Sequence, residues 1–105
     1  MTGIVSVYAV FGDRAEAEKI GRMVLDERLA ACVNLLGEAH SIYRWRGKVE
    51  EAGEVPAIFK TAATSADALM KRIAALHSYE NPAVVVWPVS DAPEAYARWV
   101  KEQMR

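Results

Sequence analysis

The chain has 105 residues, of which 52% are hydrophobic and 26% are charged. This length and composition predict a single globular domain, residues 1–105, large enough to bury its own core. With 13 basic and 14 acidic residues the net charge is −1, so no basic surface indicates nucleic acid or an anionic membrane as a partner.

No apolar run approaches the roughly 20 residues of a membrane span. The opening residues have the pattern of a strand, not of a signal peptide. A single cysteine, Cys32, excludes an intrachain disulfide and favours a reducing cytoplasm.

Hydrophobic periodicity and turn residues divide the chain into strand-like and helical segments. In chain order we expect a strand at Ile4–Phe11, a helix from an Asp13 cap to about Leu29, a strand at 31–36, two arms at Ala39–Trp45 and 49–61, a helix capped by Thr64 or Ser65, a strand at 83–89 and a helix after Pro93. The order βαββαβ predicts an α+β, ferredoxin-like fold: an antiparallel sheet with both crossover helices on one face, a long hairpin and an extra C-terminal helix. Other plait-like folds share this order.

The two arms, within residues 41–61, are the most unusual feature of the sequence. They fold back near Gly47, and Trp45 lies at the tip. Fully extended, residues 31–45 would span about 50 Å at 3.3 Å per residue, whereas a 100-residue domain has a radius of gyration near 13 Å. The hairpin must therefore overhang its own domain. Bends or bulges are expected at Gly37 and Gly53, and an edge position or bulge at Pro56.

The tip of the hairpin predicts an assembly surface. Alternation places Tyr43 and Trp45 on one face, and Arg44 and Arg46 on the other. An overhanging hairpin with an aromatic face and unpaired edges favours pairing with another chain. We therefore assign Tyr43 and Trp45 to a subunit interface. The alternative is a flexible surface hairpin with one exposed tryptophan.

Four stretches of the sequence resemble the CutA proteins, also called divalent-cation-tolerance proteins. They are ERLAACVNL at 27–35, SIYRWRGKVE at 41–50, Glu54 with Phe59-Lys60-Thr61, and LHSYENPAVVVWPV at 76–89. The resemblance implies a ferredoxin-like subunit of a homotrimer, in which long hairpin strands pair with neighbouring subunits around a threefold axis. It also implies a link to tolerance of copper and other divalent cations, with no agreed catalytic activity.

The candidate metal ligands are Cys32 and His77, with His40 as a further imidazole. Cys32 and His40 are eight residues apart, about 26 Å on an extended strand, so one ion cannot bridge them there. The alternative for Cys32 is a small buried hydrophobe. His77 follows a helical segment, where an imidazole can instead meet the last carbonyls of the helix. His40 is expected to be solvated or to act as a cap.

A second candidate site is a cleft between subunits. The resemblance implies that the polar loop 77–82 lies near the Lys60 end of the hairpin, at a subunit boundary. The cleft would be formed by Trp45, Glu54, Lys60, His77, Tyr79 and Glu80. A buried Lys60 would need a carboxylate partner, for which Glu54 or Glu80 is available. The alternative is a structural ion pair with a packed tyrosine.

No enzyme motif occurs in the sequence: there is no G-x-S-x-G, H-E-x-x-H, Walker loop, G-x-G-x-x-G or C-x-x-C. We expect a non-enzymatic homotrimeric protein of divalent metal (copper) tolerance, without an obligatory cofactor, that can bind Cu(II) or a similar ion. The alternative is a trimeric signalling or adaptor module, analogous in fold to the PII proteins, with a small molecule or a protein in the cleft between subunits.

Overall fold

The structure is a computed structural model that describes residues 2–104. Within that range it contains five strands, three α-helices and one short 3₁₀ turn. They are β1 (Ile4–Phe11), α1 (Arg14–Asp26), β2 (Cys32–Leu35), β3 (Ala39–Trp45), β4 (Lys48–Ala62), η1 (Ala63–Ser65), α2 (Ala66–Leu76), β5 (Val84–Pro88) and α3 (Glu94–Glu102). The predicted α+β order is confirmed, and every expected element is present. No helix of the described residues has the length and apolar character needed to cross a membrane.

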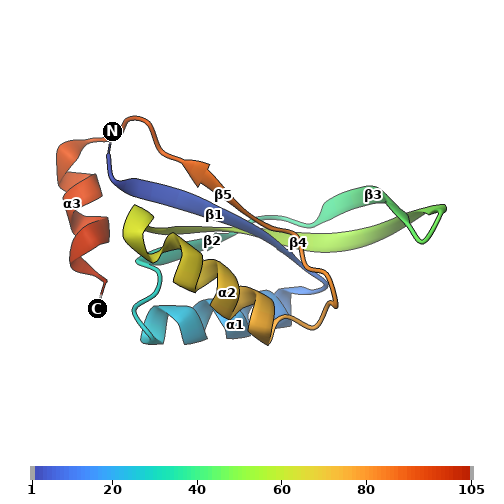
Figure 1. The fold of residues 1–105 in the computed structure, drawn as a ribbon. Helices are drawn as coiled ribbons and strands as arrows, with labels where there is room; N and C mark the ends of the chain where they lie inside the picture. The colour runs from blue at the N-terminus through green and yellow to red at the C-terminus, as the bar shows by residue number, and fades with distance from the viewer. Residues whose placement is uncertain (1, 105) are drawn as a thin grey trace.

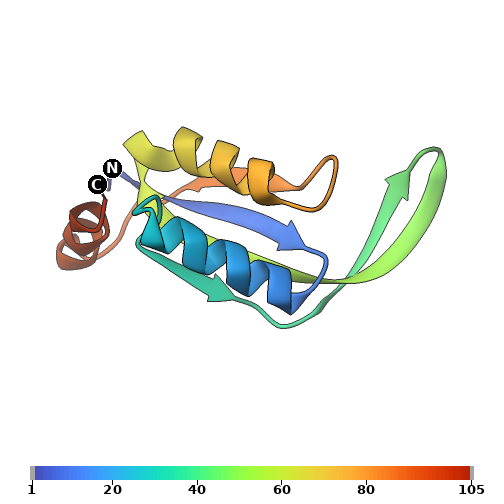
Figure 2. The same cartoon turned by 90° about the horizontal axis from the view of Figure 1, so that it is seen from below.

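The strands form an antiparallel sheet in the order β2-β4-β1-β5, and β3 continues the pairing with β4 beyond the body of the sheet. Helices α1 and α2 lie side by side on one face (Figures 1 and 2). The core lies between these layers, because strand residues that alternate toward the helices meet the apolar stripe of each helix. It includes Val7, Ala9, Phe11, Ala57 and Phe59 from the sheet and Ile20, Val24, Leu69 and Ile73 from the helices.

The first helix begins as predicted and ends earlier than predicted. The Asp13 carboxylate accepts a hydrogen bond from the Glu16 backbone N–H at 2.8 Å, which satisfies one free donor of the first turn. At the other end Arg28 adopts a left-handed conformation with φ of 58°. The Leu29 N–H then reaches the Val24 carbonyl at 2.9 Å, and Arg28 N–H reaches Leu25 at 3.0 Å. This is a Schellman ending with arginine in the position that glycine usually takes.

The arm is the ribbon formed by β3 and the first half of β4, and it projects past the body (Figure 1). Its two-residue turn has φ of 51° at Arg46 and 80° at Gly47, the positive values that a tight hairpin turn requires. The molecule measures 45 × 26 × 22 Å, with a radius of gyration of 14.2 Å. An overhanging hairpin is therefore confirmed.

A bulge separates β2 from β3, as predicted at Gly37. Residues 36–38 lie opposite only Val55 and Pro56, because Leu35 pairs with Ala57 and Ala39 pairs with Glu54. Pro56 lies inside β4 and not on an edge. The Pro56 carbonyl accepts a hydrogen bond from the Leu36 N–H at 2.9 Å. Proline has no N–H to donate, and the bulge interrupts the regular pairing at the position where that donor would be needed. Of the bend or bulge predicted at Gly53, the bulge is wrong, because Gly53 pairs in regular register with His40.

The sheet face opposite α1 and α2 stays uncovered within the chain. Tyr8 and Trp87 stack there, with ring centroids 4.8 Å apart. Val85 and Trp87 are exposed. Helix α3 packs at the end of the sheet away from the arm (Figure 1), around Ala97 and Val100. The open face therefore carries an exposed apolar group on β1 and β5, and the described part of the chain does not cover it.

Candidate functional site

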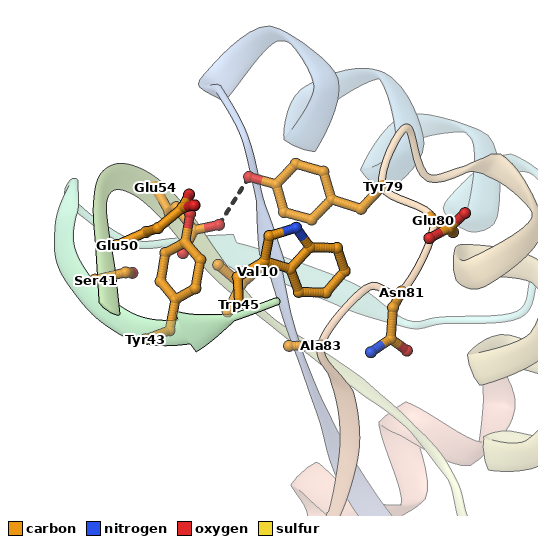
Figure 3. Close-up of a pocket in the computed structure, with 10 residues that line it drawn as sticks. All are labelled: Val10, Ser41, Tyr43, Trp45, Glu50, Glu54, Tyr79, Glu80, Asn81 and Ala83. Atoms are coloured by element: carbon orange, nitrogen blue, oxygen red, sulfur yellow. Dashed lines mark hydrogen bonds between the residues drawn. The ribbon is translucent and has the colours of Figure 1, made fainter. Parts of the chain in front are cut away.

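A cavity of about 500 Å³ lies between the arm and the body. Its walls come from three places: the arm, the loop between α2 and β5, and the end of β1 (Figure 3). The lining residues are Val10, Ser41, Tyr43, Trp45, Glu50, Glu54, Tyr79, Glu80, Asn81 and Ala83. Four of the six residues predicted for a cleft, Trp45, Glu54, Tyr79 and Glu80, line it.

The arm presents its lining residues by strand alternation. Tyr43 lies opposite Glu50, and Trp45 lies opposite Lys48. Residues directly opposite in an antiparallel pair project from the same face, so Tyr43, Trp45 and Glu50 share one face. Figure 3 shows Tyr43 and Glu50 on the arm and Tyr79 on the facing wall.

The central contact of the cavity joins Tyr79 to Glu54. The Tyr79 hydroxyl donates to Glu54 Oε2 at 2.7 Å. Glu54 is only 9% exposed, so a hydrogen bond to its carboxylate is energetically important. Burial, and then the hydrogen bond and charge of Glu54, raise the pKa of Tyr79 to about 12. At neutral pH the phenol therefore keeps its proton and ties the loop to the arm.

The loop residues before Tyr79 are fixed by His77. Its Nε2 donates to the Val10 carbonyl at 2.7 Å, and its Nδ1 accepts the Tyr79 backbone N–H at 3.0 Å. One nitrogen faces a carbonyl and the other faces an N–H, so the ring is the neutral tautomer with its proton on Nε2. The side chain is 0% exposed and stacks on Phe11 at 5.0 Å. His77 therefore positions Tyr79 and does not line the cavity.

Glu16 holds the same loop from the side of α1. Its carboxylate accepts the Ser78 N–H at 2.7 Å and the Ser78 hydroxyl at 2.9 Å. In a capping box this side chain would instead reach back to the N-cap residue. The pair Asp13 and Glu16 thus forms only half of a capping box, and Glu16 serves the loop beneath Tyr79.

The predicted metal ligands are not brought together within one chain. Cys32 lies opposite Lys60, which lies opposite Ser6, whereas His77 bonds to Val10. Ser6 and Val10 are four positions apart, about 13 Å along β1. Both His77 nitrogens already have partners, and Cys32 Sγ lies 3.8 Å from the Tyr96 hydroxyl.

The remaining donors do not complete a metal site either. His40 Nε2 lies 2.6 Å from Glu51 Oε1 in an exposed pair on the arm. Within residues 2–104 no group of three or more histidine, cysteine or acidic side chains could hold a metal ion. The donors of a single chain therefore do not fit a copper centre.

Lys60 also lies away from the cavity. It is near the C-terminal end of β4, with Cys32 of β2 on one side and Ser6 of β1 on the other. It is six positions along the strand from Glu54, about 20 Å. The carboxylates expected to pair with it have other partners. Glu54 binds Tyr79, and Glu80 lies 3.9 Å from Arg46 in an exposed ion pair.

The sequence analysis did not identify Glu50 as a lining residue. The turn itself carried the missing signal. A two-residue turn at 46–47 sets Tyr43 opposite Glu50, and this register follows from the turn length. Asn81 and Val10 had no comparable signal.

Comparisons with known proteins match nearly the whole chain. The family model described as CutA1 divalent ion tolerance protein matches residues 5–103. The divalent-cation tolerance protein CutA of Pyrococcus horikoshii is 41% identical over 102 residues, which cover 97% of this chain and 99% of that protein. The chain spans about half the length of the mouse and human CutA proteins, 49% and 48% respectively.

Solved structures agree with the sequence comparisons. CutA from Xylella fastidiosa superposes with a TM-score of 0.94 at 35% identity, covering 98% of this chain and 99% of that one. The CutA of Archaeoglobus fulgidus, described as a periplasmic divalent cation tolerance protein, superposes with a TM-score of 0.92 at 30% identity, covering 95% and 97%. By sequence and by fold, the chain belongs to the CutA1 divalent ion tolerance protein family.

Proposed function

We propose that the chain is a non-enzymatic protein of divalent-cation tolerance that acts as a homotrimer of ferredoxin-like subunits. The observation that carries the proposal is the match along almost the whole chain to proteins described as divalent-cation tolerance proteins. The reading as a non-enzyme is supported by the sequence, which contains none of the catalytic motifs that would supply a nucleophile with its base.

Two features of the subunit support self-assembly. In the arm β3 pairs only with β4, and β4 pairs with β1 only from Val55 onward, so both edges of the ribbon are unpaired within the described chain. A two-stranded ribbon is marginally stable alone, and such edges template pairing with another chain. The uncovered apolar face with Tyr8 and Trp87 offers a second surface to bury. Light scattering after size exclusion tests the proposal: a mass of three chains supports it, and a monomer overturns it.

Copper binding is proposed only for the assembly. Because the donors of one chain do not fit a metal site, a Cu(II) or similar ion would be held by groups from more than one copy, as a threefold axis permits. Titration of the assembled protein with copper tests this, with Cys32→Ser and His40→Gln compared against the unmodified chain. Saturable binding that weakens in a variant supports the proposal. Absence of saturation at micromolar copper overturns it.

The cavity supports a second candidate function: a trimeric signalling or adaptor module, of the PII kind, that takes a small molecule or a protein segment at the arm. Extraction of bound small molecules from the purified assembly, together with capture of partners from lysate, tests this candidate. A cytoplasmic location is proposed on the single cysteine. Cell fractionation tests the location, because one similar structure is described as periplasmic.

A further inference from the structure

We propose that the cavity between the arm and the body binds a small organic cation: an ammonium group carried on a short apolar or aromatic body. The proposal deepens the small-molecule alternative above and rests on it. Three properties of the cavity lead to this ligand class: the sign of its charge, the nature of its walls, and the absence of a metal geometry.

The charge of the lining is negative. Glu50, Glu54 and Glu80 contribute carboxylates, and the ten lining residues include no lysine, arginine or histidine. Two basic groups lie near the rim. Arg46 is exposed and lies 3.9 Å from Glu80, so Glu80 already has a partner. Lys48 lies opposite Trp45, on the face of the arm that carries Glu50. Glu50 and Glu54 remain to face a ligand. An anion would be repelled there, whereas a cation would be attracted in a partly dehydrated site.

Glu54 has one oxygen available to a ligand. Its Oε2 accepts from Tyr79, and its Oε1 makes no hydrogen bond to any described residue. No buried side-chain oxygen or nitrogen of the described chain lacks a partner, so solvent reaches Oε1 even though Glu54 is 9% exposed. A ligand ammonium at this oxygen would form a charge-assisted hydrogen bond, which is about twice as strong as a neutral one.

The other walls are aromatic. Tyr43, Trp45 and Tyr79 line the cavity (Figure 3), and the Trp45 ring already attracts a cation, because the Arg46 guanidinium lies 5.4 Å from its centroid. Aromatic rings bind organic ammonium groups through their faces. A volume of about 500 Å³ is within the range of small-molecule sites and accommodates a body of one ring.

The same residues argue against a metal ion as the occupant. Hard divalent cations need six or more oxygen ligands in close geometry. The described chain holds no group of three or more suitable side chains. Glu50 and Glu54 are four residues apart on β4, on the same face, about 13 Å along a strand. An ammonium group near Glu54 would have its apolar body against the aromatic side chains of Tyr43 and Trp45.

Isothermal titration calorimetry of the assembled protein with phenethylammonium tests the proposal. This probe is fully protonated at pH 7, because alkylammonium groups have pKa values near 10. Its neutral isostere, 2-phenylethanol, and the anion phenylacetate have the same ring without the positive charge. We expect saturable binding of phenethylammonium and none of phenylacetate. Equal binding of 2-phenylethanol would overturn the role of the carboxylates.

Three variants locate the site. Glu54→Gln keeps an acceptor for Tyr79 and removes the charge, and Glu50→Gln removes the second charge. Each is expected to weaken phenethylammonium binding, Glu54→Gln by about tenfold to a hundredfold. Glu51→Gln is the matched control. Glu51 is next to Glu50 on β4, and its side chain projects from the opposite face of the strand, where it contacts His40. Binding unaffected by Glu54→Gln would overturn the assignment.

Two further outcomes separate this proposal from the proposed function. Displacement of the probe by an equimolar amount of Cu(II), or absence of probe binding because a second copy fills the cavity, would overturn the organic-cation site while leaving the trimer intact. The molecular mass of the same sample reports the assembly independently. A monomer that binds phenethylammonium would overturn the trimer and keep the cavity site.

Discussion

The hydrogen bond from Tyr79 to Glu54 gives the sharpest test of the site, because one oxygen atom can be removed without changing the ring. In Tyr79→Phe, Glu54, which is 9% exposed in the unmodified chain, loses its donor at 2.7 Å. A hydrogen bond to a charged group contributes about 1.5–3 kcal/mol. Tyr79 is 38% exposed, so water partly replaces the lost donor, and we expect the lower part of that range, about 1.5–2 kcal/mol.

Urea unfolding followed by tryptophan fluorescence measures the effect. With a slope of about 1.5 kcal/mol per molar urea, typical for a domain of this size, the loss corresponds to a midpoint about 1 M lower. All variants are compared at one protein concentration, because assembly makes apparent stability concentration-dependent. An unchanged slope shows that the unfolded state is not the cause.

Tyr8→Phe is the matched control. Its ring stacks on Trp87 at 4.8 Å, and its hydroxyl makes no hydrogen bond to another described residue, so we expect a change within about 0.5 kcal/mol. A double-mutant cycle with Glu54→Ala, which removes the acceptor, isolates the coupling between the two side chains. A Tyr79→Phe midpoint equal to that of Tyr8→Phe would refute the reasoning, and so would a coupling energy near zero.

Three further predictions rest on single contacts. The pKa of Tyr79 is raised to about 12 from an ordinary value near 10, so its contribution to stability is complete below about pH 10 and disappears as the pH rises through 12; an alkaline absorbance titration should lose one late-titrating tyrosine in Tyr79→Phe. Trp45→Ala should weaken assembly, because the ring is 37% exposed within one chain and offers that area to a second copy; an unchanged mass by light scattering at low concentration would contradict this. Asp13→Ala should cost about 1 kcal/mol of unfolding free energy through the lost helix cap, and Asp13→Asn, which still caps, should restore it.

The strands were predictable because their signals are local. Alternation and the turn at Gly47 set the bounds of β1 and β3 correctly, and the length of residues 31–45 alone required the overhang. The end of α1 was predicted about three residues late, because no glycine or asparagine signals it. Arg28 takes the left-handed position only because the Leu29 and Arg28 amides find the carbonyls of the last turn.

The metal prediction shows what residue type alone cannot supply. His77 is an imidazole beside a phenol and a carboxylate in the sequence, a combination that suggests a ligand. In the fold its Nε2 and Nδ1 are bonded to Val10 and to the Tyr79 backbone. Whether a histidine nitrogen is free to bind a metal depends on the backbone groups around it. The Val10 carbonyl that occupies Nε2 is 67 residues away in the sequence, so no local sequence pattern indicates this contact. Cys32 was likewise separated from His77 by the register of the sheet.

The bulge at residues 36–38 decides which side chains of the arm face the cavity. In β2 the even-numbered residues Cys32 and Asn34 share a face with Lys60 and Ile58. Because three residues then lie opposite two, the parity changes, and in β3 the odd-numbered residues share the face of Glu50 and Glu54. Uninterrupted alternation would turn residues 40, 42 and 44 toward the cavity and Tyr43 and Trp45 away from it. One extra residue near Gly37 thus converts a histidine, isoleucine and arginine face into an aromatic wall beside two carboxylates, and the cation site depends on that conversion as much as on the residues themselves.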